Sequence, residues 1–189
     1  IMFKISSALI VFSLCISTAQ ADTHLKERAQ KSKVVVKEIM TQLKGELEAA
    51  MKAGGPVNAI NVCHEKAPAI AASLSEKHGW DIARTSLKTR NPANAPDAWE
   101  TKVLSDFEAR KTKGEDVKPM AYFEAVDTDG KQNFRFMKAI PTGEVCLKCH
   151  GTDITPLVKA KLQELYPNDM ATGFKLGDIR GAFTITQPM

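Results

Sequence analysis

Two runs of alternating side chains meet in MAYFEAVDTDGKQNFRFMKA, residues 120–139. Side chains alternate in character along residues 120–126, and the alternation returns along residues 134–139. A period of two is typical of β-strands. Residues 127–131, DTDGK, contain an Asp-Gly pair, which is typical of a tight turn. We therefore predict an antiparallel hairpin over this stretch.

Helical periodicity dominates the chain before this hairpin. Apolar side chains recur at three- and four-residue steps along residues 23–53 and again along residues 57–77, with a Gly-Gly-Pro sequence between the two runs. Pro68 lies inside the second helix and removes a backbone donor. We therefore expect a kink near Cys63 and His64.

The remaining elements are short and complete the fold prediction. We expect a strand over residues 81–87, a third helix with Pro96 in its first turn, a helix over residues 156–165 and a last strand over residues 179–186. Helices followed by a mostly antiparallel sheet define the α+β class.

The first 21 residues have the character of a secretory signal peptide. Lys4 precedes an apolar run over residues 5–16, and small residues follow up to Ala21. The run is shorter than the roughly 20 residues that span a bilayer, which disfavours a membrane anchor. We expect cleavage after Ala21, a single domain over residues 22–189 and a periplasmic location.

The charge pattern and the cysteine count restrict the function classes. The chain of 189 residues has 26 Lys and Arg against 22 Asp and Glu, and the two signs are interspersed. This pattern does not favour nucleic-acid binding. Beyond residue 21 the cysteines are Cys63, Cys146 and Cys149. An odd number in an oxidising compartment indicates a use other than simple disulfide pairing.

The motif Cys146-Leu147-Lys148-Cys149-His150 follows the hairpin almost directly. Cys-x-x-Cys-His is the attachment motif of haem c, in which two cysteine sulfurs form thioethers with the haem and the histidine binds its iron. Covalent haem is attached after export, so the signal peptide and the motif support each other.

Two other chemistries remain open for Cys146 and Cys149. A thiol-disulfide oxidoreductase also uses Cys-x-x-Cys, but in a βαβ context with a helix that starts at the first cysteine. A zinc site would need Cys63 and His64 as its second half, and adjacent residues are not the usual ligand spacing.

Six-coordinate haem iron needs a second axial ligand. The candidates are Cys63, the histidines His24, His64 and His78, and several methionines, and we consider Cys63 and His64 first. At about 100° per residue both lie near the centre of the apolar stripe, so periodicity does not choose between them. A thiolate on iron would give a low potential, and it would weaken as a ligand when the iron is reduced. Cys63 with His64 as a substitute would then form a redox-linked switch.

Three stretches together resemble a known family. They are NAINVCHEKAPAIAASLSEKHGW, ARTSLKTRNPANAPDAWE, and CLKCHG with YPNDMATGFKLGDIRGAF. They resemble a family of exported bacterial haem proteins, long catalogued only as a domain of unknown function. Its members are single-domain c-type cytochromes and the sensing ectodomains of histidine kinases. The resemblance covers about residues 33–186.

The resemblance implies a fold and a ligand set. It implies a PAS-like fold, with helices packed around a central antiparallel sheet. It also implies haem c bound through Cys146 and Cys149, with His150 as one axial iron ligand and Cys63 as the other. Proteins of this kind are candidate redox or gas sensors, or low-potential electron carriers.

The matching segments contain Arg84, Arg90 and Arg180. A guanidinium matches a carboxylate in two-point geometry, so Arg84 and Arg90 are candidates to bind the haem propionates, with a structural role as the alternative. For Arg180 we favour a structural role, paired with Asp169 or Asp178.

The sequence thus predicts a periplasmic c-type haem protein rather than an enzyme. Its expected partners are haem and a redox partner protein or a small gas, and its expected role is electron transfer or redox or gas sensing. A periplasmic thiol-disulfide oxidoreductase that uses Cys146 and Cys149 is the alternative.

Overall fold

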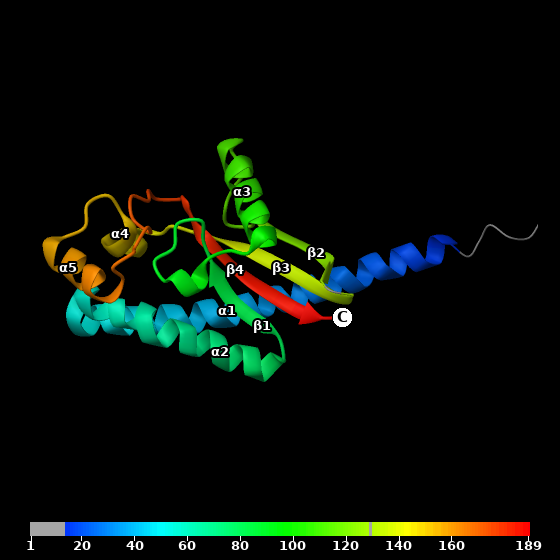
Figure 1. Ribbon diagram of the computed structural model, residues 1–189, viewed down its shortest axis with the longest axis horizontal. Helices are drawn as coiled ribbons and strands as arrows, with labels where there is room; N and C mark the ends of the chain where they lie inside the picture. The colour runs from blue at the N-terminus through cyan, green and yellow to red at the C-terminus, as the bar shows by residue number, and fades with distance from the viewer. Residues whose placement is uncertain (1–13, 129) are drawn as a thin grey trace, which may run out of the picture.

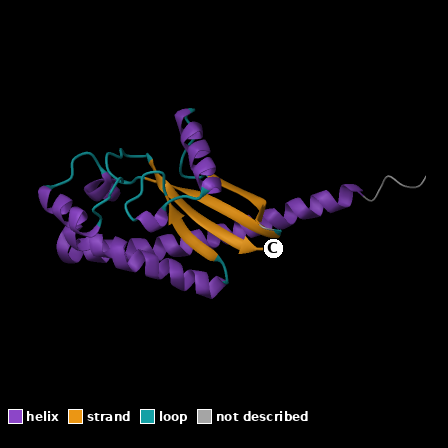
Figure 2. Ribbon diagram, in the orientation of Figure 1, coloured by secondary structure: helices purple, strands orange, loops and turns teal. Residues whose placement is uncertain are grey.

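The computed structural model describes residues 14–128 and 130–189. A four-stranded antiparallel sheet, in the order β1-β4-β3-β2, lies between helices (Figure 1, Figure 2). The strands are β1 (Asp81–Thr85), β2 (Ala121–Thr128), β3 (Lys131–Pro141) and β4 (Ile179–Pro188). The α-helices are α1 (Leu14–Asn61), α2 (Ala67–His78), α3 (Ala98–Thr112), α4 (Glu144–His150) and α5 (Pro156–Leu165).

The predicted hairpin is confirmed as the centre of the sheet. β2 and β3 pair in antiparallel register, with Thr128 opposite Lys131 at the turn. Phe134 and Phe136 are fully buried on one face of β3, and Met137 is fully buried on the other face. Both faces of this strand are therefore covered, and its alternation separates two hydrophobic cores rather than a core from solvent.

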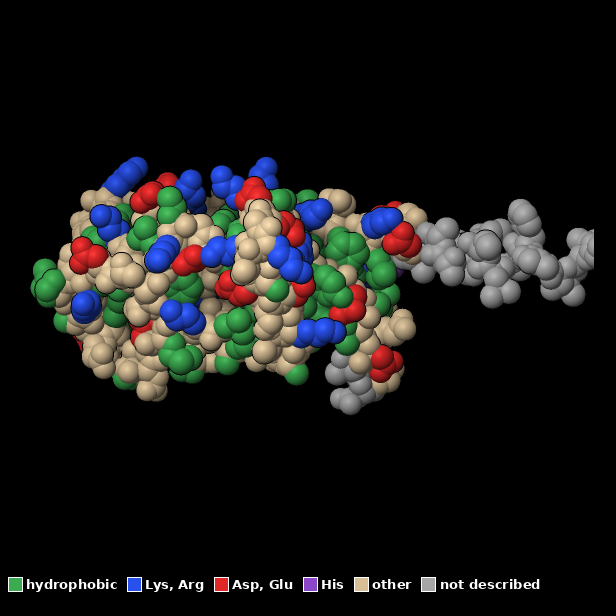
Figure 3. Space-filling view, turned by 90° about the horizontal axis from the view of Figure 1, so that it is seen from above, with side chains coloured by type: hydrophobic (Ala, Val, Ile, Leu, Met, Phe, Trp, Pro, Cys, Tyr) green, Lys and Arg blue, Asp and Glu red, His purple; other side chains and the backbone are tan. Residues whose placement is uncertain are grey.

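The two cores define the layers of the molecule. On one face of the sheet, α1 and α2 pack against the buried phenylalanines of β3 and against β4, while α3 packs on the opposite face (Figure 1). This arrangement is α+β and PAS-like, as predicted. Viewed from the side of α3, basic and acidic side chains are interspersed over the surface (Figure 3).

The helix α1 is longer than predicted. It begins at Leu14 rather than near residue 23, and the predicted break is present as non-helical backbone at Gly54 and Gly55. Met40 is one of the apolar residues that recur along residues 23–53, but it is 49% exposed. Most of the predicted signal peptide falls on residues 1–13, which lie outside the described residues. No helix among the described residues is both long and apolar enough to cross a membrane.

The expected irregularity near Cys63 is a single π-helical turn, η1 (Val62–Lys66), between α1 and α2. The N–H of Ala67 donates to the carbonyl oxygen of Val62, five residues back. Pro68 has no N–H and would press on the carbonyl four residues before it, so the wider turn accommodates the proline. Turns of this kind are frequent at functional sites.

The start of α3 differs from the prediction. Pro96 was expected in the first helical turn, but the helix is capped at Asp97. The Asp97 carboxylate accepts a hydrogen bond from the N–H of Glu100 at 2.7 Å, and the Glu100 carboxylate accepts one from the N–H of Asp97 at 3.1 Å. This reciprocal capping box fixes the N-cap one residue after Pro96 and the first helical residue at Ala98.

Candidate functional site

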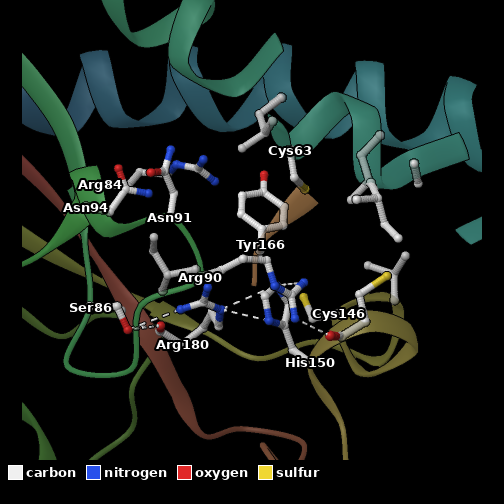
Figure 4. A pocket seen from close by; sticks show the side chains of 18 of the residues that line it. Cys63, Arg84, Ser86, Arg90, Asn91, Asn94, Cys146, His150, Tyr166 and Arg180 are labelled. Carbon is white, nitrogen blue, oxygen red and sulfur yellow. Dashed lines mark hydrogen bonds between the residues drawn. The ribbon is translucent and has the colours of Figure 1, made fainter. Parts of the chain in front are cut away.

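A pocket lies at the end of the sheet where β1 and β3 finish and β4 begins (Figure 4). It is bounded by α1 and η1 on one side and by α4 on the other. It has a cavity volume of about 210 Å³ and opens to solvent. Much of its lining is apolar and comes from α1 and its junction with η1: Leu43, Leu47, Met51, Ala59 and Ile60.

The helix α4 presents the Cys-x-x-Cys-His motif to this pocket. Cys146, Cys149 and His150 all line it, because positions i, i+3 and i+4 share one helix face. The helix begins at Glu144, two residues before the first cysteine. No helix was predicted at these cysteines. They follow the β2–β3 hairpin of an antiparallel sheet, and not a strand of a βαβ unit, which still disfavours a thioredoxin-like redox pair.

The residue after the motif must be small. A β-carbon on Gly151 would lie 2.6 Å from the carbonyl oxygen of Leu147, although the backbone of Gly151 is not left-handed. The N–H of Gly151 donates to this same oxygen at 3.0 Å and ends the helix. The glycine therefore lets the chain turn tightly directly behind His150.

The imidazole of His150 is held in one orientation. Its Nδ1 lies 2.7 Å from the carbonyl oxygen of Ala171. Because a carbonyl only accepts, Nδ1 carries the proton and the lone pair is on Nε2. Burial, followed by the positive charges of Arg180 and Arg90, lowers the pKa of His150 well below its usual range. The ring is therefore neutral at physiological pH, as a metal ligand must be.

Arg180 lies beside His150 rather than in the predicted ion pair. Its Nε lies 3.2 Å from Nδ1 and 3.4 Å from Nε2 of His150, and its Nη1 donates to Ser86 Oγ at 3.1 Å (Figure 4). The prediction that Arg180 pairs with Asp169 or Asp178 is wrong. Asp169 instead pairs with Arg90, and Asp178 pairs with Lys111.

The guanidinium of Arg90 forms its ion pair and its hydrogen bonds within the protein. Its guanidinium pairs with Asp169 at 2.9 Å and also donates to the carbonyl oxygens of Cys149, at 2.5 Å, and Ala171, at 3.2 Å. These contacts tie the end of α4 to the loop that holds the His150 ring. The geometry therefore favours the structural alternative for Arg90.

Arg84 differs from Arg90 although both line the pocket. Within the described part of the chain its guanidinium makes no hydrogen bond or ion pair. Burial lowers the pKa of Arg84. Its side chain lies with those of Asn91 and Asn94 on one wall (Figure 4). An unpaired guanidinium with two amides beside it is suited to a carboxylate.

Cys63 and His64 are separated by the structure. Cys63 is half-buried and points into the pocket from η1, on the wall that faces His150 (Figure 4). His64 is exposed and does not line the pocket. Its ring instead meets the edge of Tyr166, with 5.4 Å between centroids.

The cysteine chemistry also bears on the alternatives left open by the sequence. Cys63, Cys146 and Cys149 are free thiols in this structure. Burial raises the pKa of Cys149, whereas a redox-active thiol needs a lowered pKa. Among the described residues, no three His, Cys, Asp or Glu side chains are grouped to hold a metal ion. The zinc alternative therefore gains no geometric support.

Tyr166 is the pocket residue that sequence reasoning missed. It is 6% exposed, and burial, followed by the negative charge of a Cys63 thiolate, raises the pKa of Tyr166 to about 12. Its position one residue past α5 gives no local signal of a pocket. Leu43, Leu47 and Met51 were predicted only as part of a helix stripe.

The fold and this pocket define an α+β, PAS-like protein with a cavity lined by sulfur, imidazole and guanidinium groups. Residues 18–188 match the family model described as Tll0287-like (Tll0287), and the chain belongs to the Tll0287-like family. The crystal structure of the cyanobacterial heme-protein Tll0287 matches with a TM-score of 0.65 and 23% identity, over 86% of this chain and 96% of that chain. This likeness establishes a shared fold. No curated protein matches the sequence.

Proposed function

We propose that this chain is a periplasmic c-type haem protein that transfers electrons, or senses redox state or a small gas, through iron bound by His150 and Cys63. The observation that carries the proposal is the convergence of Cys146, Cys149 and His150 on one wall of a pocket and Cys63 on the facing wall. The related cyanobacterial protein Tll0287 is itself a heme-protein, which is consistent with the proposal.

The lining of the pocket fits haem. The apolar side chains of α1 suit the porphyrin faces. Arg84, with no partner in the described part of the chain, suits a propionate.

The charges of the side chains that line the pocket also match the charges of haem. Of the three guanidinium groups that line the pocket, that of Arg90 is offset by Asp169, which leaves the charges of Arg84 and Arg180. Haem has two propionates. A Cys63 thiolate would offset the net positive charge of ferric porphyrin. A buried group whose charges are matched in this way avoids the cost of burying unpaired charge.

The residues around the iron have separate roles. Cys146 and Cys149 would hold the haem by thioether bonds, and His150 would bind its iron through Nε2. The carbonyl of Ala171 fixes the imidazole tautomer, and Arg90 holds the loop that carries this carbonyl. Bound haem would supply one-electron chemistry between ferric and ferrous iron.

The first test is chemical. Purified protein, produced in cells that attach haem c, should give the pyridine haemochrome spectrum of haem c, with one haem per chain. A preparation that is folded but gives no such spectrum would refute the proposal.

The ligand assignment has its own test and a matched control. Substituting Cys63 by Ala should change the ferric electron paramagnetic resonance spectrum, because a thiolate ligand is lost. His64→Ala should leave this spectrum unchanged, because His64 is exposed and outside the pocket. An altered spectrum in His64→Ala alone would transfer the ligand role to His64.

The choice between carrier and sensor depends on whether a ligand leaves the iron. Reductive titration with added carbon monoxide distinguishes them. Binding of the gas only after reduction supports a sensor, since it requires Cys63 to leave. Iron that binds no gas in either state supports electron transfer.

The periplasmic location rests on the first 21 residues of the sequence, and Edman sequencing of exported protein tests it. A mature chain that begins at Asp22 supports the location. The alternative, a thiol-disulfide oxidoreductase, needs a reactive thiolate, and the raised pKa of Cys149 counts against that role for Cys149.

A further inference from the structure

Tyr166 is fixed firmly in the wall of the pocket. Its N–H donates to the carbonyl oxygen of Leu162 at 2.7 Å, and its own carbonyl accepts from the N–H of Asp169 at 3.0 Å. The side chain packs in a cluster with Ile60, Val158 and Leu162. The ring therefore has little freedom to turn its hydroxyl elsewhere.

The ring packs against the segment that carries Cys63, on both sides of that residue. Ile60 shares a hydrophobic cluster with Tyr166, and the His64 ring meets the Tyr166 ring at 69°. Cys63 lies between these two contacts in the sequence. Figure 4 shows the Tyr166 hydroxyl directed toward the wall with Cys63 and away from His150.

The hydroxyl of Tyr166 is unpaired within the part of the chain that the structure describes. Tyr166 is 6% exposed and lines the pocket, yet within the described residues its hydroxyl makes no hydrogen bond. The hydroxyl faces the pocket, so we expect its acceptor to be a group bound there. The propionate side of the pocket already has the Arg84 guanidinium and the amides of Asn91 and Asn94 (Figure 4).

We propose that Tyr166 is a positioning residue whose hydroxyl donates a hydrogen bond to the Cys63 sulfur when that sulfur is bound to iron. The inference rests on the proposed function. Such a bond withdraws electron density from the thiolate, weakens its donation to the iron and favours the reduced state. Tyr166 thereby raises the midpoint potential.

The test compares two Tyr→Phe substitutions in the haem-loaded protein. The chain has two tyrosines, and Tyr122 is 37% exposed on β2 and does not line the pocket. Tyr166→Phe should shift the midpoint potential to a more negative value and raise the iron–sulfur stretching frequency. Tyr122→Phe should leave both at the wild-type values. A Tyr166→Phe protein with wild-type potential and frequency overturns the inference.

A second measurement needs no substitution. If Tyr166→Phe fails to load haem, it tests the hydrogen bond to the Cys63 sulfur in the wild-type protein. In wild-type protein the iron–sulfur frequency should change between H₂O and D₂O, because an exchangeable proton bonds the sulfur. An unchanged frequency overturns the inference. If Cys63→Ala leaves the ferric resonance spectrum unchanged, the proposed ligation itself fails. If that spectrum changes while Tyr166→Phe has no effect, only the hydrogen bond is refuted.

Discussion

Arg84 and Arg90 line the same pocket, but their guanidinium groups have different partners. Arg90 forms an ion pair with Asp169 and donates hydrogen bonds to the carbonyl oxygens of Cys149 and Ala171. Arg84 has no partner within the described residues. The sequence could not separate them, because both lie in one polar segment and their partners come from distant parts of the chain. The structure favours Arg84 as the group left available for a ligand.

Replacing Arg84 by Gln in the haem-loaded protein should make the midpoint potential more negative. A nearby positive charge favours the reduced state, and at an effective dielectric of 20 a charge about 10 Å away contributes about 1–2 kcal/mol. Lys102→Gln removes the same charge from an exposed position on α3 and should change the potential far less. Equal shifts in the two variants would show that Arg84 has no special relation to the iron.

At the scale of elements, the π-helical turn η1 and the short α-helix α4 position the candidate ligands. The π-helical turn η1 was expected as a kink because Pro68 is visible in the sequence, but its extra residue per turn was not predicted. The short helix α4 was not predicted at all. Its seven residues are too few to establish a periodicity, and its ends are set by Gly143 and Gly151. The local sequence thus indicated a kink near Cys63 and a Cys-x-x-Cys-His motif at residues 146–150. It did not predict the π-helical turn or the short helix that these regions form.

Gly151→Ala should destabilise the protein by about 1–3 kcal/mol, the usual cost of overpacking. The added β-carbon would lie 2.6 Å from the carbonyl oxygen of Leu147, so the turn behind His150 must open. In contrast, a β-carbon on Gly45 meets nothing within 4 Å. Gly45→Ala in α1 should be neutral or stabilising by up to about 1 kcal/mol. Denaturant unfolding of both variants measures the difference, and equal stabilities would contradict the assigned role of Gly151.

Over the whole molecule, side-chain periodicity predicted the α+β class, the hairpin and most helices. This worked because Phe134, Phe136 and Met137 alternate in step with the two cores. Periodicity could not predict that η1, α4 and β4 converge at one end of the sheet, since that depends on tertiary packing. Tyr166 and the contact between Arg180 and His150 were missed for the same reason.

The claim that this convergence holds a covalent haem is tested most directly by the intact mass of the denatured protein after alkylation of its thiols. We predict a chain that retains the mass of one haem, with Cys63 alkylated and both Cys146 and Cys149 unreactive. A chain without added haem mass, in which Cys146 and Cys149 are both alkylated, would contradict the account.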